Sequence, residues 1–190
     1  MRQAIAARRD SRSTAPKRII PEHIIMAEDT QAQAGAERQF ALRTVYLKDL
    51  SFESPNAPEI FQGEWKPETA LHMDIQVSQL DAQTHEIVLT ITVTAKAGEK
   101  TAYLVEIQQA GIVSAQGFEQ QEYGPLFYVY CPSILFPYAR QAVTDVVAKG
   151  GFPQLVLQHI NFDAIYAQKL AEQQQQDGAD QSATPQPTTH

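Results

Sequence analysis

The chain has 190 residues and a formal net charge of −7 at pH 7. This length suits one domain with tails, which buries roughly 70% of its unfolded surface and needs no covalent staple. The single cysteine excludes an intrachain disulfide and favours a reducing compartment. Because no apolar run approaches the roughly 20 residues that span a bilayer, direct membrane insertion is not expected.

The first 25 residues differ from the rest in charge, with six basic residues against two acidic ones. They lack the apolar stretch of a secretory signal, and an organellar transit peptide is the less favoured alternative. We interpret them as disordered or as the product of an upstream start codon, within a flexible extension that reaches residue 39. The remaining nine basic and 20 acidic residues give a net charge of −11. This argues against nucleic-acid binding, which needs clustered lysine and arginine.

Alternating hydrophobicity predicts four strands between residues 40 and 109, separated by a proline-rich loop and two short turns. The apolar faces are Phe40, Leu42, Tyr46, Leu50 and Phe52 in the first strand, Leu71, Met73, Ile75 and Val77 in the second, Ile87, Leu89, Ile91 and Val93 in the third, and Tyr103, Val105 and Ile107 in the fourth. The opposite faces carry Arg43, Asp49, Ser51 and Glu53, then Thr90, Thr92 and Thr94, and finally Leu104, Glu106 and Gln108. The loop over residues 55–67 cannot be a central strand, because its prolines lack the N–H donor, yet it carries Phe61 and Trp65.

Two helices follow the strands. In the first, apolar or small residues recur at helical spacing from Leu135 to Val147, with Pro132 and Pro137 expected at its start and Gly150 at its end. In the second, Asn161 is the expected N-cap and Phe162 begins the apolar face. Residues 112–130 are read as a loop with at most a short helix, and residues 172–190 as a disordered Gln-rich tail.

Strands followed by helices predict the α+β class: a four-stranded antiparallel sheet with helices packed on one face. The folded domain is expected to span residues 40–171. The other sheet face must meet water or a partner.

The sequence holds no phosphate-binding loop, nucleophile elbow, dinucleotide fingerprint or Cys-x-x-Cys pair. His85-Glu86 begins like a zinc-protease motif, but Leu89 stands where the second histidine is needed. His72 and His159 are isolated, and Cys131 is read as a structural thiol. We therefore expect no enzyme activity, no catalytic residues, no metal and no cofactor.

Four stretches carry a resemblance to a known family: YLKDLSFESPNAP at 46–58, CPSILFPYAR at 131–140, GFPQL at 151–155 and NFDA at 161–164. In this order, across residues 40–168, they resemble the SecB family of bacterial protein-export chaperones. The resemblance implies a homotetramer built as a dimer of dimers. It also implies ATP-independent binding of unfolded preproteins in the cytoplasm and their delivery to the SecA translocation motor.

The resemblance also implies roles for individual residues. SecA binding maps to Asp49, Glu53, Leu104 and Glu106, and tetramer pairing maps to Val105, Ile107 and Gln109. The groove for unfolded clients maps to Phe61, Trp65, Leu71 and Met73, each of which would equally suit the core. The Gln-rich tail does not reproduce the family's second motor contact, and that contact stays open.

Three hypotheses remain at this stage. An export chaperone predicts a tetramer that binds many unfolded sequences, and a SecB-like chaperone for one toxin–antitoxin pair predicts a narrow client range. A thiol enzyme predicts a reactive Cys131, which the sequence disfavours because no catalytic base lies near it. The acidic residues at the SecA-binding positions favour export over the dedicated chaperone.

Overall fold

The computed structural model describes residues 38–181, with side chains through residue 174. The expected extension up to residue 37 and residues 182–190 of the expected tail lie outside the described residues. The strands are β1 (Gln39–Glu53), β2 (Pro67–Gln79), β3 (Thr84–Ala97) and β4 (Lys100–Gln116), and the main helices are α2 (Cys131–Lys149) and α3 (Phe162–Gln181). Shorter helical segments are η1 (Glu59–Gln62), η2 (Gln120–Glu122), α1 (Tyr123–Pro125) and η3 (Leu126–Tyr130).

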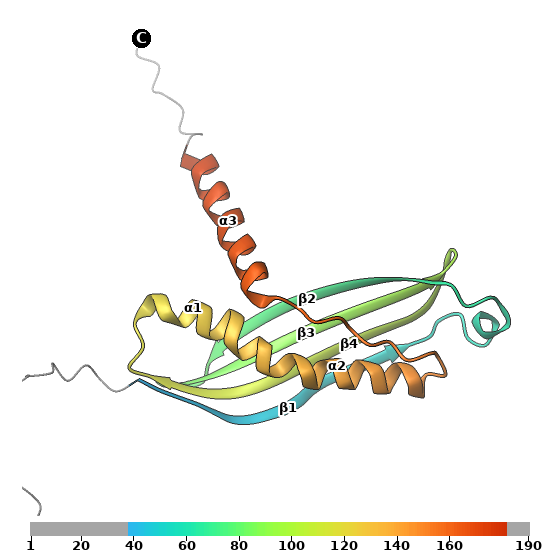
Figure 1. The fold of residues 1–190 in the computed structure, drawn as a ribbon, viewed down its shortest axis with the longest axis horizontal. Helices are drawn as coiled ribbons and strands as arrows, with labels where there is room; N and C mark the ends of the chain where they lie inside the picture. Colours follow the sequence, from blue (N-terminus) through green and yellow to red (C-terminus); the bar gives the residue numbers. More distant parts are fainter. Residues whose placement is uncertain (1–37, 182–190) are drawn as a thin grey trace, which may run out of the picture. The chain divides into compact units, whose positions relative to one another are not determined.

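The four strands form one antiparallel sheet in the order β1-β4-β3-β2, and α2 lies lengthwise along one of its faces (Figure 1). On that face, α2 packs against β4, β3 and β1. The sheet residues with no exposed surface beneath it include Ile87, Leu89, Ile91, Val93, Val105 and Ile107. The predicted fold class is therefore confirmed, because period-two burial in β3 and β4 matches the alternation of the sequence.

Strand β1 departs from simple alternation. Its register against β4 shifts between Leu42 and Thr44 and again between Leu47 and Asp49. Each bulge inserts one unpaired residue, so the first inverts the alternation and the second restores it. The predicted placement of Tyr46 on the α2 side is therefore wrong: Tyr46 pairs with Ala110 and lies on the helix-free face. The residues that lie on the α2 side as predicted are Phe40, Leu42, Leu50 and Phe52.

Residues 112–130 were predicted as a loop with a possible short helix, and the structure corrects the loop: most of the segment is strand or helical turns. Strand β4 continues to Gln116, and the chain turns at Gly117, whose φ of 75° suits glycine. From Gln120 onward, η2, α1 and the π-helical η3 lead directly into α2. The two glycines and the single proline of this segment suggested a break. Proline is tolerated in the first turn of a helix, however, because the backbone N–H there has no partner within the helix.

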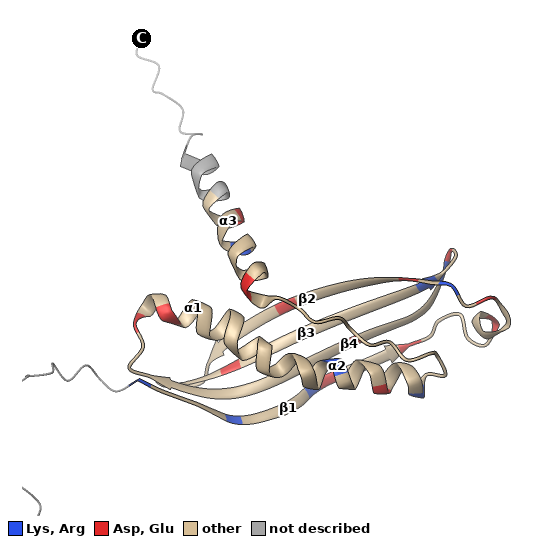
Figure 2. Cartoon of the chain, in the orientation of Figure 1, with Lys and Arg blue, Asp and Glu red and all other residues tan. Residues whose placement is uncertain are grey.

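Helix α2 spans 19 residues and begins at Cys131, before the apolar repeat that starts at Leu135. Pro132 lies in its first turn as expected, whereas Pro137 lies inside the helix rather than at its start. The helix continues past Pro137 because one face stays buried through Leu135, Ala139, Val143 and Val147. Figure 2 shows its charged residues in the second half, where Arg140, Asp145 and Lys149 lie.

An extended linker returns from α2 to α3. The Thr144 hydroxyl donates a hydrogen bond to the Leu155 carbonyl at 2.8 Å, which ties the linker to α2. The Asn161 side chain accepts a hydrogen bond from the Ala164 N–H at 3.1 Å, so the predicted N-cap is present. Helix α3 continues to Gln181, ten residues past the expected domain end at 171.

Candidate functional site

The helix-free face of the sheet carries an acidic patch made by Asp49, Glu53 and Glu106. Directly opposed residues of an antiparallel pair share a face. Asp49 is opposite Gln108, Ser51 is opposite Glu106, and Glu53 is opposite Leu104. The four residues assigned to SecA binding therefore lie together on adjacent strands. Asp49 and Glu53 are exposed, whereas Leu104 and Glu106 are half-buried.

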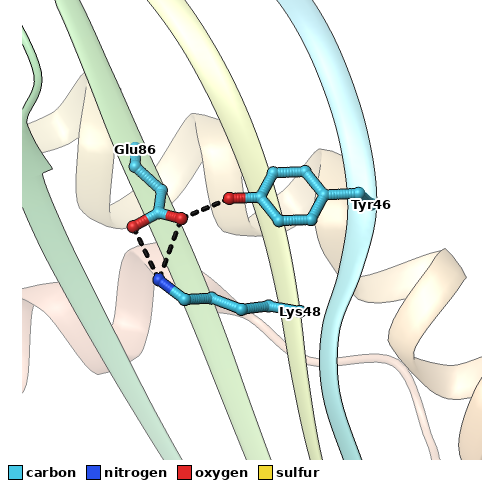
Figure 3. Close-up of polar contacts among 3 residues, drawn as sticks. All are labelled: Tyr46, Lys48 and Glu86. Carbon is cyan, nitrogen blue, oxygen red and sulfur yellow. Dashed lines mark hydrogen bonds and ion pairs between the residues drawn. The ribbon is translucent and has the colours of Figure 1, made fainter.

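A charged cluster of Tyr46, Lys48 and Glu86 lies on the same face (Figure 3). The Tyr46 hydroxyl donates a hydrogen bond to the Glu86 carboxylate. The Lys48 ammonium contacts both carboxylate oxygens, at 2.9 Å and 2.8 Å. Sequence reasoning missed this cluster, because the β1 bulges that bring Tyr46 and Lys48 toward β3 leave no mark in the hydrophobic pattern.

The hydrogen bonds of the cluster favour an ionised Glu86 and a neutral Tyr46 at neutral pH. The Lys48 hydrogen bond, followed by that of Tyr46, lowers the pKa of the Glu86 carboxyl. In turn, the Glu86 hydrogen bond, with help from burial, raises the pKa of Tyr46 to about 12. Glu86 is therefore an anion that holds a cation on one side and a neutral phenol on the other.

Two of the predicted client-groove residues, Phe61 and Trp65, gather around Phe152 at the end of α2. The ring centroids lie 4.8 Å from Phe152 for Phe61 and 5.2 Å for Trp65. Trp65 also stacks on Tyr103 at 6.4 Å and is half-buried, whereas Phe61 is 50% exposed. Phe61 therefore offers free aromatic surface, and Trp65 belongs partly to the core.

The other two, Leu71 and Met73, line a separate groove of about 200 Å³ between β2 and α3. Three aromatic residues that were not predicted to line the groove complete it: Tyr128, Phe162 and Tyr166. The rings of Tyr128 and Tyr166 stack at 6.0 Å, and the Lys169 ammonium lies 5.5 Å from the Tyr128 ring. The structure thus places the four predicted groove residues in two apolar sites rather than one.

The residues assigned to tetramer pairing lie beneath α2. Val105 and Ile107 have no exposed surface within the single chain, and Gln109 is 4% exposed. The Gln109 side-chain amide donates a hydrogen bond to the Tyr46 carbonyl at 2.8 Å. Exposed apolar residues of β1, η3 and α2 remain open in the single chain: Leu42, Leu47, Leu50, Tyr130 and Tyr138.

Cys131 is buried, and burial raises the pKa of its thiol to about 12. A thiol with this pKa is protonated at neutral pH and is a poor nucleophile. His85 packs against Phe127 with ring centroids 4.6 Å apart, whereas Glu86 points to the other face of the sheet. These neighbours in sequence therefore do not form a common site.

Residues 38–181 contain no group of three or more histidine, cysteine, aspartate or glutamate side chains placed to hold a metal ion. None of the helices in this part of the chain has the length and apolar character needed to cross a membrane.

An acidic sheet face on one side, with an apolar groove and a half-exposed aromatic cluster on the other, is typical of a protein of the binding class. Comparisons with known proteins identify the family. A family profile described as "Preprotein translocase subunit SecB" matches residues 33–173. The chain belongs to the SecB family.

Relatives named "Protein-export protein SecB" are similar over most of the chain. That of Methylococcus capsulatus is 51% identical over 160 residues, covering 84% of this chain and 99% of the relative. That of Marinobacter nauticus is 51% identical over 155 residues, covering 80% and 93%. A solved structure of a Mycobacterium tuberculosis SecB-like chaperone, in complex with a peptide from the HigA1 antitoxin, has a TM-score of 0.52 at 16% identity and covers 64% of this chain and 91% of that one. This last likeness supports the fold.

Proposed function

We propose that the protein is an ATP-independent export chaperone of the bacterial cytoplasm, which binds unfolded preproteins and delivers them to SecA. The observation that carries this proposal is the 51% identity, over nearly the whole length of the relative, to a protein named for protein export. The two exposed apolar sites and the acidic patch supply the two kinds of surface that client holding and delivery need.

Client binding is assigned to the two apolar sites. Phe61 is 50% exposed and Leu71 is 44% exposed, so both offer apolar surface that an unfolded segment can cover. Aromatic rings at Phe152, Tyr128 and Tyr166 form the walls. Two separated sites suit an extended chain that crosses from one to the other, because each contributes apolar area without demanding a particular sequence.

Delivery to SecA is assigned to the acidic patch together with Leu104. Exposed carboxylates attract a basic surface, raise its association rate and lose effect as salt is added. The half-buried Leu104 adds apolar contact beside Glu53, its partner across the strands.

Assembly into a homotetramer, a dimer of dimers, is assigned to the α2 side. The apolar surface of β1 and α2 that stays open in the single chain is suited to a second copy. The side chains of Val105, Ile107 and Gln109 lie inside the protomer. They would therefore affect assembly indirectly, by fixing the positions of α2 and of the β1 backbone.

A chaperone dedicated to one toxin–antitoxin pair remains the alternative. Its support is the fold likeness to the mycobacterial SecB-like chaperone, at only 16% identity. The export relatives are about three times more similar in sequence. We therefore favour export.

The proposed function is tested by titrating the wild type and the variant Asp49→Ala/Glu106→Lys with SecA and with an unfolded preprotein. The variant should lose salt-sensitive SecA binding, keep its assembly state and keep client affinity within about a factor of three, or roughly 0.6 kcal/mol. Joint loss of both partners would indicate a structural lesion. Retention of both would mean that the acidic patch is only solvated surface.

A further inference from the structure

Lys48 is the residue inserted at the second bulge of β1, and it has no partner on β4. It directly precedes Asp49, the first carboxylate of the acidic patch. An unrestrained lysine in this position would pair with Asp49, because adjacent groups of opposite charge on one face attract each other even in water. In the structure its ammonium instead contacts both oxygens of Glu86, two strands away.

Glu86 is well placed to hold this lysine. Its side chain is 13% exposed while that of Lys48 is 41% exposed, so the carboxylate forms the fixed side of the pair. The Tyr46 hydroxyl donates a further hydrogen bond to the same carboxylate and covers it from the β1 side (Figure 3). The contacts of Lys48 therefore leave the Asp49 carboxylate open to solvent.

We propose that Glu86 is a positioning residue for SecA docking, which sequesters Lys48 and thereby leaves the acidic patch unneutralised. This inference rests on the proposed function and deepens it. Glu86 need not touch SecA: it acts through Lys48, and the bulge that inserts Lys48 is what allows the side chain to turn from Asp49 toward β3.

The test is titration of SecA with the wild type, Glu86→Gln and Glu86→Gln/Lys48→Gln at low and high ionic strength. Glu86→Gln keeps the shape of the side chain and releases Lys48, so SecA affinity should fall about fivefold at low ionic strength. Removing the released lysine should restore affinity to within about a factor of two of wild type, whereas damage to the fold would not be repaired by losing a second side chain.

Asp74→Asn supplies a matched control for the simple loss of one negative charge. Asp74 lies on the helix-free face in register with Asp49 across β3 and β4. Strand spacing puts its backbone about 14 Å from that of Asp49, and the corresponding separation for Glu86 is about 16 Å. At such distances in water a unit charge changes affinity by only about a factor of two.

An effect of Asp74→Asn equal to that of Glu86→Gln would overturn the inference, since charge alone would then explain both. The inference would also be overturned if Glu86→Gln lowers SecA affinity and the added Lys48→Gln does not restore it. If the wild type and Glu86→Gln bind SecA with equal affinity, only the role of Glu86 is refuted. Absence of SecA binding by the wild type would refute the proposed function and this inference together.

Discussion

Gly150, the C-cap residue directly after α2, leaves the space that the Phe52 ring occupies. A Cβ atom there would lie 2.7 Å from Phe52 Cε1, closer than side chains tolerate. The ring cannot easily withdraw, because Tyr103 and Phe152 pack against it with centroids at 6.1 Å and 6.4 Å. The backbone of Gly150 is itself in the ordinary helical region, with φ −71°, so steric overlap alone opposes a larger residue.

Gly150→Ala should therefore lower the free energy of unfolding by about 1–3 kcal/mol, the usual cost of overpacking. Gly63→Ala is the matched control, because nothing lies within 4 Å of the Cβ position there and its φ of −94° suits alanine. Urea denaturation of both variants measures the difference. Equal stabilities would show that Phe52 moves aside without cost.

The charged cluster makes a second prediction, about the ionisation of Tyr46. Because the hydrogen bond to Glu86 raises the pKa of Tyr46 to about 12, the folded protein favours the neutral phenol. The contribution to stability is fully present below the unfolded pKa of 10.0 and is lost as pH rises toward 12. Carbon-13 NMR of labelled tyrosine, assigned with Tyr46→Phe, should show Tyr46 still neutral at about pH 11, where an unperturbed tyrosine is mostly ionised. Ionisation near pH 10 would contradict the hydrogen bond.

Tyr46 also marks the limit of sequence reasoning at this scale. Its apolar ring and even position predicted the buried side of β1, yet two bulges place it on the helix-free face. A bulge depends on the backbone pairing of β1 with β4, and the hydrophobic pattern of β1 does not indicate where it occurs. Asp49 and Glu53 lie on the predicted face because both bulges precede them and cancel.

At the scale of elements, the four strands and two main helices followed from periodicity, since the core itself imposes it. Ile87, Leu89, Ile91 and Val93 are all fully buried, as period-two alternation predicted. The helical turns from Gln120 to Tyr130 did not follow. Gly124 and Pro125 favour a turn locally. The burial of Phe127, which packs against His85 of β3, overrides that preference.

The four residues predicted to line one client groove lie in two apolar sites, and the proposed role of both sites in client binding can be tested. The double variant Phe61→Ala/Leu71→Ala removes half-exposed apolar surface from both sites with little effect on the core. Each truncation should cost about 0.7 kcal/mol of client binding, for a combined loss of roughly tenfold. Fluorescence titration with an unfolded preprotein measures it.

Leu80→Ala is the control for general apolar surface, because Leu80 is 55% exposed and lies between β2 and β3, outside both sites. It should leave client affinity unchanged. If Leu80→Ala and the double variant weaken binding equally, capture does not depend on the two sites.

The whole molecule presents different surfaces on the two sides of one sheet. The helix-free side is mostly polar and carries the acidic patch, and the α2 side buries the core but leaves β1 incompletely covered. Leu42, Leu47 and Leu50 are 37%, 48% and 38% exposed on that side. Strand β1 is also an edge strand, and an exposed apolar edge favours association with another chain. Motor docking and self-assembly are thus proposed on opposite sides, which allows both at once.

This arrangement determines which substitution can test the proposed tetramer. An aspartate at Val105 would place a charge with no exposed surface beneath α2, at a cost of several kcal/mol to the protomer itself. Loss of the tetramer would then report unfolding rather than a broken contact. Leu47→Asp puts the charge on surface that is open in the single chain, so the protomer should keep its fold while a second copy is repelled. Native mass spectrometry should show tetramers for the wild type and for Leu80→Asp, and smaller species for Leu47→Asp with an unchanged circular dichroism spectrum. Tetramers that survive Leu47→Asp at micromolar concentration would place the contact away from the exposed leucines of β1.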